Sequence, residues 1–369
     1  MKVVNFAAGE LDLEPPPVLR ETLAAAARNR GAHRYTDTAG LPELREALAD
    51  RISRLSGVAY EPGEVMVTAG AKHALHLAFL ALVDPGDEVL VPRPGWGTFA
   101  EQVRLAGGVP VPVATWDTGF VPTVRKLEER RTGRTRAVVL NTPGNPTGAV
   151  CPPETIAEIV RWAVRHRVWI IFDESYGELV EPGTDHCHPV ALLPEARELT
   201  VGIGSFSKSF AVTGWRVGHV HAPASLVAVL KNMQSQTSSN ATSVVQHAVL
   251  PAARGEVDGF VSDVRGILAS RRSRVAAALT GLPGVSFDMP QGAFYFFLDV
   301  RALLGRGLGG AVVDNTEGLA ELLLRRAGTA LTPGTAFGAE GYLRLSYAID
   351  ASMIDEGLAS LKKVLDDVL

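Results

Sequence analysis

The feature of this 369-residue sequence that most limits its fold is a series of short, largely apolar runs separated by longer helical patterns. Alternate residues of a strand face opposite sides of a sheet, so an apolar residue at nearly every position indicates burial on both faces. Such strands occur where helices cover both faces of a sheet. The runs lie at residues 88–91, 109–113, 137–141, 168–172, 199–204 and 216–221.

Helical patterns fill most of the intervals between these runs, at residues 72–82, 98–106, 124–131 and 153–167. The last of them opens with Pro152-Pro153, and proline suits the first turn of a helix because no backbone partner is lost there. Alternating strands and helices predict an α/β fold with a mostly parallel central sheet flanked by helices.

The last third of the chain has a different order of elements, which predicts a smaller α+β domain. We expect a large domain over residues 45–255 and a small domain formed by residues 1–44 and 256–369. The expected elements of the C-terminal part are a helix at 259–279, strands at 285–289 and 294–299, a helix at 317–327, a strand at 342–347 and a final helix from Ala351.

Composition and charge argue against several functions. With 36 basic and 40 acidic residues the formal net charge is −4, which gives no electrostatic reason to expect nucleic acid or a membrane as partner. Cys151 and Cys187 are too few for a disulfide framework, and Glu10 and Asp12 interrupt the N-terminus before a signal-peptide apolar stretch. The sequence therefore predicts a cytoplasmic protein.

A lysine follows one of the expected buried strands. Lys208 is flanked by Ser205, Ser207 and Ser209, and Arg216 comes shortly after. A buried lysine is unfavourable unless it is paired or neutralised, and a Schiff base removes its charge. Hydroxyl and guanidinium groups are suitable donors to a phosphate. Taken alone, the segment is equally compatible with an exposed loop lysine beside a surface arginine.

Two further segments follow other expected strands. Residues 141–148, NTPGNPTG, form a turn, and residues 173–176, DESY, come directly after the strand at 168–172. Asp173 is thereby placed at the carboxyl end of a buried strand, the edge at which open α/β sheets bind ligands. An ionised carboxylate buried there needs a cationic partner, which a protonated pyridine nitrogen would provide.

In type and order these segments resemble the fold-type I enzymes that use pyridoxal 5′-phosphate (PLP), and specifically the class I and II aminotransferases related to bacterial aspartate aminotransferases. The resemblance runs from Val4 to the final helix, and the SxSK…GxR pattern together with NPTG is specific to this family. It implies reversible, ping-pong transfer of an amino group between an L-α-amino acid and a 2-oxo acid, in amino acid metabolism and biosynthesis.

The resemblance also implies the catalytic residues, which are Lys208, Asp173 and Tyr176. Lys208 is expected to carry PLP as a Schiff base and to move the proton between the substrate and the cofactor. Asp173 is expected to keep the pyridinium protonated. Asn145 and Tyr176 are expected to hydrogen-bond the phenolic oxygen of the cofactor.

The phosphate of PLP is expected at the helix start Gly70-Ala71-Lys72, because free backbone N–H groups at a helix N-terminus attract anions. By the same resemblance, Ser205, Ser207 and Arg216 complete the phosphate site, and the Trp96 ring stacks on the pyridine. Without the resemblance, the first segment is an ordinary helix start and Trp96 an ordinary core residue.

For the substrate, the resemblance implies that Arg344 binds the α-carboxylate, with Gly9 and Asn145 close by. The strand pattern alone places Arg344 opposite its leucine neighbours, on a face that is either solvent or the site. Tyr35 is expected to reach the phosphate of a neighbouring subunit, which implies a homodimer with shared active sites.

The chain departs from the family pattern near the expected substrate pocket. Leu11 replaces the proline of the usual Gly-Glu-Pro-Asp, the helix that precedes this motif in many relatives is missing, and Gly95 and Gly97 are expected to trim the pocket wall. These departures argue against aspartate as substrate. Lys72 argues for it, because acid-specific bacterial relatives use a lysine here for the distal carboxylate. The substrate side chain therefore stays open.

Three other patterns are interpreted structurally. Residues 185–188, DHCH, do not match zinc-ligand spacings, so a solvated loop and no metal site are expected. Gly202-Ile203-Gly204 lacks the third glycine of a dinucleotide fingerprint. The basic residues within 125–136 are expected on a solvated helix face.

The main alternative keeps PLP but changes the chemistry to that of a specialised biosynthetic β-lyase, cyclase or oxidase, because one fold supports many reactions. Release of ammonia or hydrogen peroxide without a keto-acid acceptor would distinguish it from transamination. A ligand-sensing module would need an attached DNA-binding segment, and an NAD enzyme would need the glycine fingerprint, so we expect neither.

Overall fold

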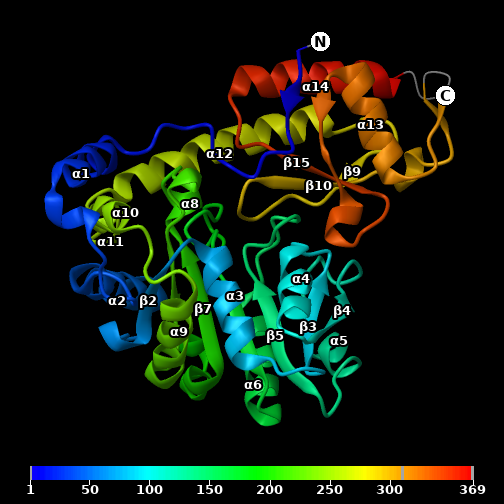
Figure 1. The fold of residues 1–369 in the computed structure, drawn as a ribbon. Coiled ribbons are helices and arrows are strands. Elements are labelled where there is room, and N and C mark those ends of the chain that lie inside the picture. The colour runs from blue at the N-terminus through cyan, green and yellow to red at the C-terminus, as the bar shows by residue number, and fades with distance from the viewer. Residues whose placement is uncertain (1, 309–310, 367–369) are drawn as a thin grey trace.

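The computed structural model describes residues 2–308 and 311–366, whose strands form a seven-stranded sheet, a four-stranded sheet and two small two-stranded sheets, with helices around them (Figure 1). The larger sheet has the order β2-β8-β7-β6-β5-β3-β4, and only β8 runs antiparallel to its neighbours. The predicted α/β class with a mostly parallel sheet is confirmed; β2 was not among the expected runs. The strands are β2 (Val65–Thr68), β3 (Glu88–Arg93), β4 (Val109–Ala114), β5 (Thr135–Asn141), β6 (Trp169–Asp173), β7 (Thr200–Ser205) and β8 (Gly218–His221).

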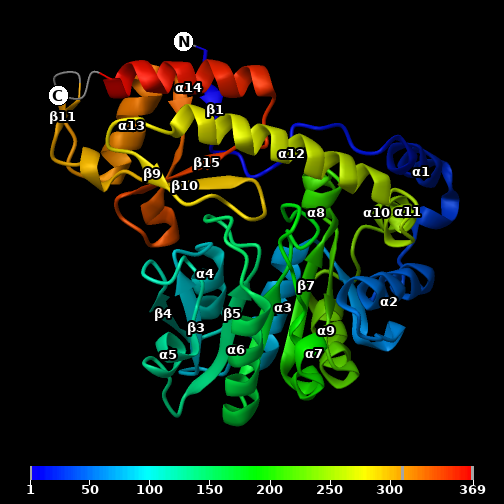
Figure 2. The same cartoon turned by 180° about the vertical axis from the view of Figure 1, so that it is seen from behind.

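Alternate residues of the central strands are buried on opposite faces, as the apolar runs predicted. In β6, Ile171 packs on the face covered by α3, α4 and α9, whereas Ile170 and Phe172 pack on the face covered by α5 and α6. Figure 1 is seen from the side of α3 and α9, and Figure 2 from the side of α6. These helices are α3 (Ala71–Leu82), α4 (Thr98–Leu105), α5 (Val124–Glu128), α6 (Pro153–His166) and α9 (Ala224–Thr237).

The second sheet is antiparallel, in the order β14 (Thr332–Pro333), β15 (Tyr342–Ser346), β10 (Tyr295–Asp299) and β9 (Ser286–Phe287). The N-terminal strand β1 (Val4–Asn5) pairs with β13 (Thr329–Ala330), so the chain start joins its C-terminal part. The helices of this part are α12 (Asp258–Leu279), α13 (Thr316–Ala327) and α14 (Ala351–Asp366). The domain limits at 44/45 and 255/256 stay a prediction.

The remaining elements are short helices and a small hairpin. Figure 1 shows α1 beside α10 and α11, below one end of the long helix α12. The other short elements are α1 (Pro17–Arg28), α2 (Pro42–Ser56), α7 (Pro189–Leu192), α8 (Phe206–Ser209), α10 (Ser243–Ala248), α11 (Leu250–Ala253), β11 (Gly307–Leu308) and β12 (Ala311–Val312). Among the described residues, no helix combines the length and the apolarity that crossing a membrane requires.

The carboxyl ends of β5, β6 and β7 meet at one edge of the larger sheet, since these strands are parallel. The register pairs Asn141 with Asp173, and Asp173 with Ile203, next to the end of β7 at Ser205. This edge faces the second sheet, and the segments that the sequence analysis singled out leave the larger sheet there (Figure 1).

Candidate active site

Lys208 lies on a single helical turn, α8, that begins as soon as β7 ends. The Ser205 side chain caps this turn by accepting a hydrogen bond from the Ser207 N–H at 3.1 Å. The Lys208 ammonium is mostly buried and donates to the Gly9 carbonyl. Burial, together with the charges of Arg216 and Arg344, lowers the pKa of Lys208 to about 8. An amine with this pKa exchanges protons readily near neutral pH.

Asp173 is a buried carboxylate, 3% exposed, at the end of β6. It accepts a hydrogen bond from the Ser175 N–H at 3.0 Å. None of the ion pairs within 4.0 Å in residues 2–308 and 311–366 involves Asp173. Burial raises its pKa to about 6 in spite of the Ser175 hydrogen bond. A carboxylate in this state favours a cationic partner, as the protonated ring nitrogen of PLP would be.

A cavity of about 580 Å³ brings most of the expected site residues together. Of these, only Gly70 and Tyr35 do not line it. Asn141, Ser175 and Tyr295 also line the cavity and were not predicted. A tyrosine hydroxyl in the phenylalanine-rich strand 294–297 is the one signal that would have pointed to Tyr295. The predicted residues on the wall are Gly9, Ala71, Lys72, Trp96, Asn145, Asp173, Tyr176, Ser205, Ser207, Lys208, Arg216 and Arg344.

One end of the cavity is an anion site. Helix α3 begins at Ala71, and Gly70 before it has a left-handed φ of +83°. A Cβ at Gly70 would lie 2.5 Å from Nη2 of Arg216, so glycine is needed for the guanidinium to approach the helix start. A helix N-terminus, a guanidinium and the Ser205 and Ser207 hydroxyls together suit a phosphate.

Arg344 lines the cavity from β15 and is 7% exposed, so its face of β15 is the site and not solvent. Its Nη1 donates to Asn145 Oδ1 at 2.9 Å and its Nη2 to the Ala7 carbonyl at 2.7 Å. The buried Nε of Arg344 has no partner among the described residues. The guanidinium carbon lies 4.4 Å from the Tyr295 ring centroid, and the Tyr295 and Tyr176 hydroxyls are 2.8 Å apart. This arrangement suits a bidentate carboxylate.

Trp96 and Lys72 line the cavity next to each other. The Lys72 ammonium lies 4.9 Å from the Trp96 ring centroid, and Lys72 takes part in no ion pair within 4.0 Å among the described residues. A cation over an indole face is favourable and keeps the ammonium oriented. Lys72 is therefore available to a second anionic group of a ligand.

Gly95 and Gly97 were expected to widen the substrate pocket. Neither glycine lines the cavity, so this expectation is wrong. A Cβ at Gly95 would lie 2.4 Å from the Pro92 carbonyl oxygen, and one at Gly97 would lie 3.0 Å from that of Ala336. Both glycines are required by close backbone packing.

Tyr35 is 87% exposed and follows the short turn at Arg30–His33. It does not line the cavity of its own chain. Its expected contact with a phosphate needs a second subunit, so this role stays a prediction.

The expectation of a solvated loop at residues 185–188 is wrong for His188, which is 3% exposed and contacts His221. By contrast, Arg125, Lys126 and Arg131 form exposed or partly exposed ion pairs with carboxylates, as expected for a solvated helix face.

Comparison with known proteins extends over the whole chain. Residues 1–361 match the family model described as aminotransferase class I and II. An aspartate aminotransferase of Streptomyces avermitilis is 41% identical over 367 residues, which are 99% of this chain and 90% of that protein. The structure of Thermus thermophilus aspartate aminotransferase with maleate is similar with a TM-score of 0.92, at 37% identity, over 99% of this chain and 92% of the other. The structure of Rhizobium meliloti aspartate aminotransferase is similar with a TM-score of 0.95, at 33% identity, over 100% of this chain and 92% of the other.

Proposed function

The chain belongs to the class I and II aminotransferase family, and from this premise we propose that the cavity between the two sheets is the active site and that aspartate is the amino donor. The protein is a PLP-dependent transferase that exchanges an amino group between an L-α-amino acid and a 2-oxo acid. The observation that carries the site assignment is one cavity that holds a buried lysine, a buried carboxylate and an arginine, where the carboxylate has no ion-pair partner and the arginine Nε no hydrogen-bond partner within the described part of the chain.

Lys208 and Asp173 perform the proton chemistry in this proposal. PLP, when bound, supplies the electron sink for the pair of electrons left at the substrate Cα. Lys208 would hold PLP through its Nζ, and the same Nζ, once free, would be the base that takes the proton from the substrate Cα. Asp173 would keep the ring nitrogen of PLP protonated, and Tyr176 and Asn145 would donate hydrogen bonds to its phenolic oxygen.

Arg344 and Lys72 select the substrate. Arg344 binds the α-carboxylate through its guanidinium edge, and the cation–π contact with Tyr295 holds that edge in place. Lys72 binds the distal carboxylate of aspartate, in keeping with the dicarboxylate maleate in the related Thermus structure. The main alternative of the sequence analysis, a β-lyase, cyclase or oxidase, is not favoured by the aspartate aminotransferase relatives.

We also propose that the active enzyme is a cytoplasmic homodimer in which Tyr35 of each chain reaches the partner's phosphate site. The exposure of Tyr35 supports the dimer, because a large aromatic side chain that is 87% exposed is a candidate for burial in an interface. The location is supported by Cys151 and Cys187, which are both free thiols.

A single-turnover experiment tests the reaction and the substrate separately. PLP-loaded enzyme is mixed with aspartate in the absence of a keto acid, and oxaloacetate, ammonia and hydrogen peroxide are measured. We expect one oxaloacetate per active site and neither ammonia nor peroxide. Ammonia or peroxide would overturn the site mechanism, whereas a 2-oxo acid from another amino acid but not from aspartate would overturn only the substrate.

A variant separates the role of Lys72 from general damage to the site. Lys72→Gln is expected to raise KM for aspartate at least about tenfold, the effect of losing one charge-assisted hydrogen bond, and to leave KM for an apolar amino acid nearly unchanged. Equal losses for both substrates would exclude a contact between Lys72 and the distal carboxylate.

A further inference from the structure

Glu174, His188 and His221 come from three separate segments and meet next to the larger sheet. Nε2 of His188 and Nε2 of His221 are 3.0 Å apart, and Nε2 of His221 lies 3.6 Å from Oε1 of Glu174. One ligand atom from each residue lies within 4.8 Å of the others. A tetrahedral zinc ion with bonds of about 2.0–2.1 Å needs ligand atoms about 3.3 Å apart. We propose that these three side chains form a binding site for a divalent transition-metal ion, zinc foremost.

Two glycines of β7 leave room for two histidine rings of β8, one of which is the proposed ligand His221. The register pairs Gly202 with His221 and Gly204 with His219. A Cβ at Gly202 would lie 2.0 Å from His221 Nε2, and one at Gly204 would lie 2.2 Å from His219 Cε1. The two glycines that resemble part of a dinucleotide fingerprint therefore keep space on the sheet for two histidine rings.

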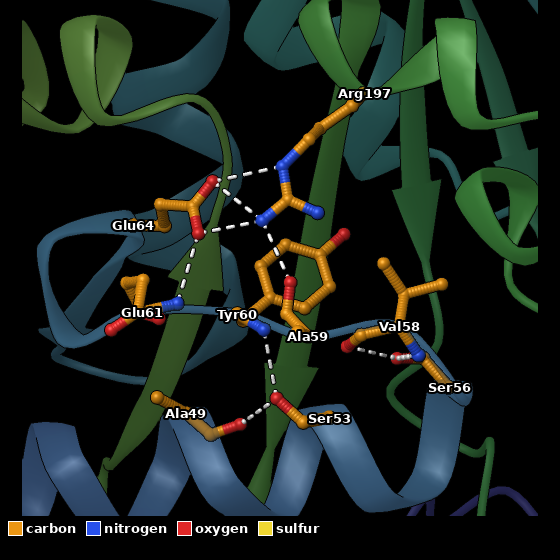
Figure 3. A network of polar contacts seen from close by, with 9 residues as sticks. All are labelled: Ala49, Ser53, Ser56, Val58, Ala59, Tyr60, Glu61, Glu64 and Arg197. Atoms are coloured by element: carbon orange, nitrogen blue, oxygen red, sulfur yellow. Dashed lines mark hydrogen bonds and ion pairs between the residues drawn. The ribbon is translucent and has the colours of Figure 1, made fainter.

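Figure 3 shows a polar network around Tyr60, whose ring packs against the two histidines. The Tyr60 ring packs edge-on against His221, with 5.1 Å between ring centroids, and against His188 at 6.0 Å. The Arg197 guanidinium lies 4.6 Å from the Tyr60 ring centroid and donates to Glu64 through Nε at 3.1 Å and Nη2 at 2.7 Å. Positions fixed in this way reduce the entropy lost when ligands are ordered around a metal.

The charge balance also suits a cation. Within the described residues, the only cationic-type groups within 4.0 Å of the Glu174 carboxylate are imidazoles, His186 at 3.4 Å and His221 at 3.6 Å. The Glu174 side chain is 22% exposed and His221 is fully buried. A partly buried carboxylate without a lysine or arginine partner gains from a bound divalent ion.

A cavity of about 310 Å³ adjoins two of the three proposed ligands, Glu174 and His188, whereas the fully buried His221 does not line it. Glu174, His186, His188 and His219 line it. This cavity shares only Ser205 with the wall of the cofactor cavity. The metal site is therefore separate from the reacting atoms, and its expected role is to tie the segment before α7 to the end of β8.

Binding requires a proton to move within His188. The Val190 N–H donates to His188 Nδ1 at 3.3 Å, which places the proton of the neutral ring on Nε2, facing His221. A metal needs the Nε2 lone pair, so the proton moves to Nδ1 and the long Val190 contact is lost. We therefore expect weaker binding than at a closed structural zinc site.

The test uses the full chain with PLP bound, freed of metal by a chelator and then titrated with zinc chloride. Bound zinc is measured by equilibrium dialysis, and the melting temperature is followed in parallel. We expect one zinc per chain with a micromolar Kd, and a melting temperature that rises with zinc concentration.

Two variants remove a ligand and one matched variant does not. His221→Gln removes one imidazole, and His188→Asn removes the other while keeping a side-chain acceptor for the Val190 N–H, so the turn is preserved. His219→Gln changes a partly buried histidine of the same strand that pairs with Gly204 and is not a ligand. We expect at least about tenfold weaker zinc binding in the first two variants and an unchanged Kd in the third.

The proposal is overturned if the wild-type chain binds no more zinc than His221→Gln, or if His219→Gln weakens binding as much as His221→Gln. The PLP absorption spectrum and the circular dichroism of each variant are recorded in the same samples. A variant that has lost its fold is replaced by Glu174→Gln, for which the same tenfold loss is expected.

Discussion

Asp173 and Glu174 are consecutive carboxylates in opposite environments. Asp173 ends β6 and lines the cofactor cavity, whereas Glu174 lines the other cavity beside the histidines. Burial raises the pKa of Asp173 to about 6. Burial acts in the same direction on Glu174, but the His186 hydrogen bond and neighbouring imidazoles lower its pKa to about 2. One step along a strand end turns a side chain to the other face, so two similar residues serve different sites.

The largest effect that separates the two sites is expected from Lys208→Ala. It removes the group that holds the cofactor and moves the proton, so turnover should fall by at least about 10⁴-fold. Steady-state oxaloacetate formation measures the loss. Lys231→Ala, which changes a lysine paired with Asp37 on the surface, is the control and should keep normal turnover. Normal turnover in Lys208→Ala would contradict the assignment.

The next largest effect is expected from substitutions of the two carboxylates, Asp173 and Glu174. Asp173→Asn removes the negative charge that holds the pyridine nitrogen protonated, so kcat should fall by about 10²-fold or more. Glu174→Gln, on the side of the histidines, should change kcat by less than about threefold. The ratio of the two kcat values is the measurement, and similar losses would show that both carboxylates act on the cofactor.

Stability against pH gives a third comparison, in the PLP-free protein. Because the pKa of Asp173 is raised from 3.8 to about 6, its contribution to stability is present below pH 4 and is lost as the pH rises through about 6. Asp173→Asn should therefore be more stable than the wild type at pH 8, by up to about 3 kcal/mol, and not at pH 4.

Glu174→Gln is the matched variant for that experiment. In the wild type the pKa of Glu174 is lowered. The contribution of this carboxylate to stability is therefore present above the ordinary pKa of 4.5 and is lost only as the pH falls through about 2. The difference from the wild type should be constant between pH 5 and 8. Urea unfolding across this range measures both variants, and a parallel pH profile for the two would show that their environments are alike.

The smallest effect is expected from Tyr35→Phe. This variant tests whether the cofactor site depends on a partner chain while the histidine site does not. Loss of one hydrogen bond to a phosphate should weaken PLP binding by about tenfold. Zinc binding at the histidines should not change, since its ligands come from one chain. Fluorescence titration with PLP measures the first and equilibrium dialysis the second. Unchanged PLP affinity would remove Tyr35 from the site.

Much of the fold could be predicted because local pattern and tertiary burial agree. The run at residues 88–91 became β3 and the pattern at 153–167 became α6, with shifts of one or two residues at the ends. End positions depend on capping contacts, which the periodicity does not contain. Part of the cofactor cavity could be predicted because Asp173 and Lys208 follow strands whose carboxyl ends must meet, whereas Gly9, Trp96 and Arg344 were named only through the family resemblance.

The sequence by itself determined six of the seven strands of the larger sheet, the family and the residues around Lys208, since these depend on short-range pattern and on motifs along the chain. Only the tertiary structure decided which face Arg344 takes, why Gly95 and Gly97 are glycines, and that His188 meets His221 and Glu174. The physical reason is that these facts depend on register and on side-chain direction between segments far apart in the chain. Spacing along the sequence suggested no metal ligands at residues 185–188, whereas the pairing of β7 with β8 placed a histidine opposite a glycine beside them.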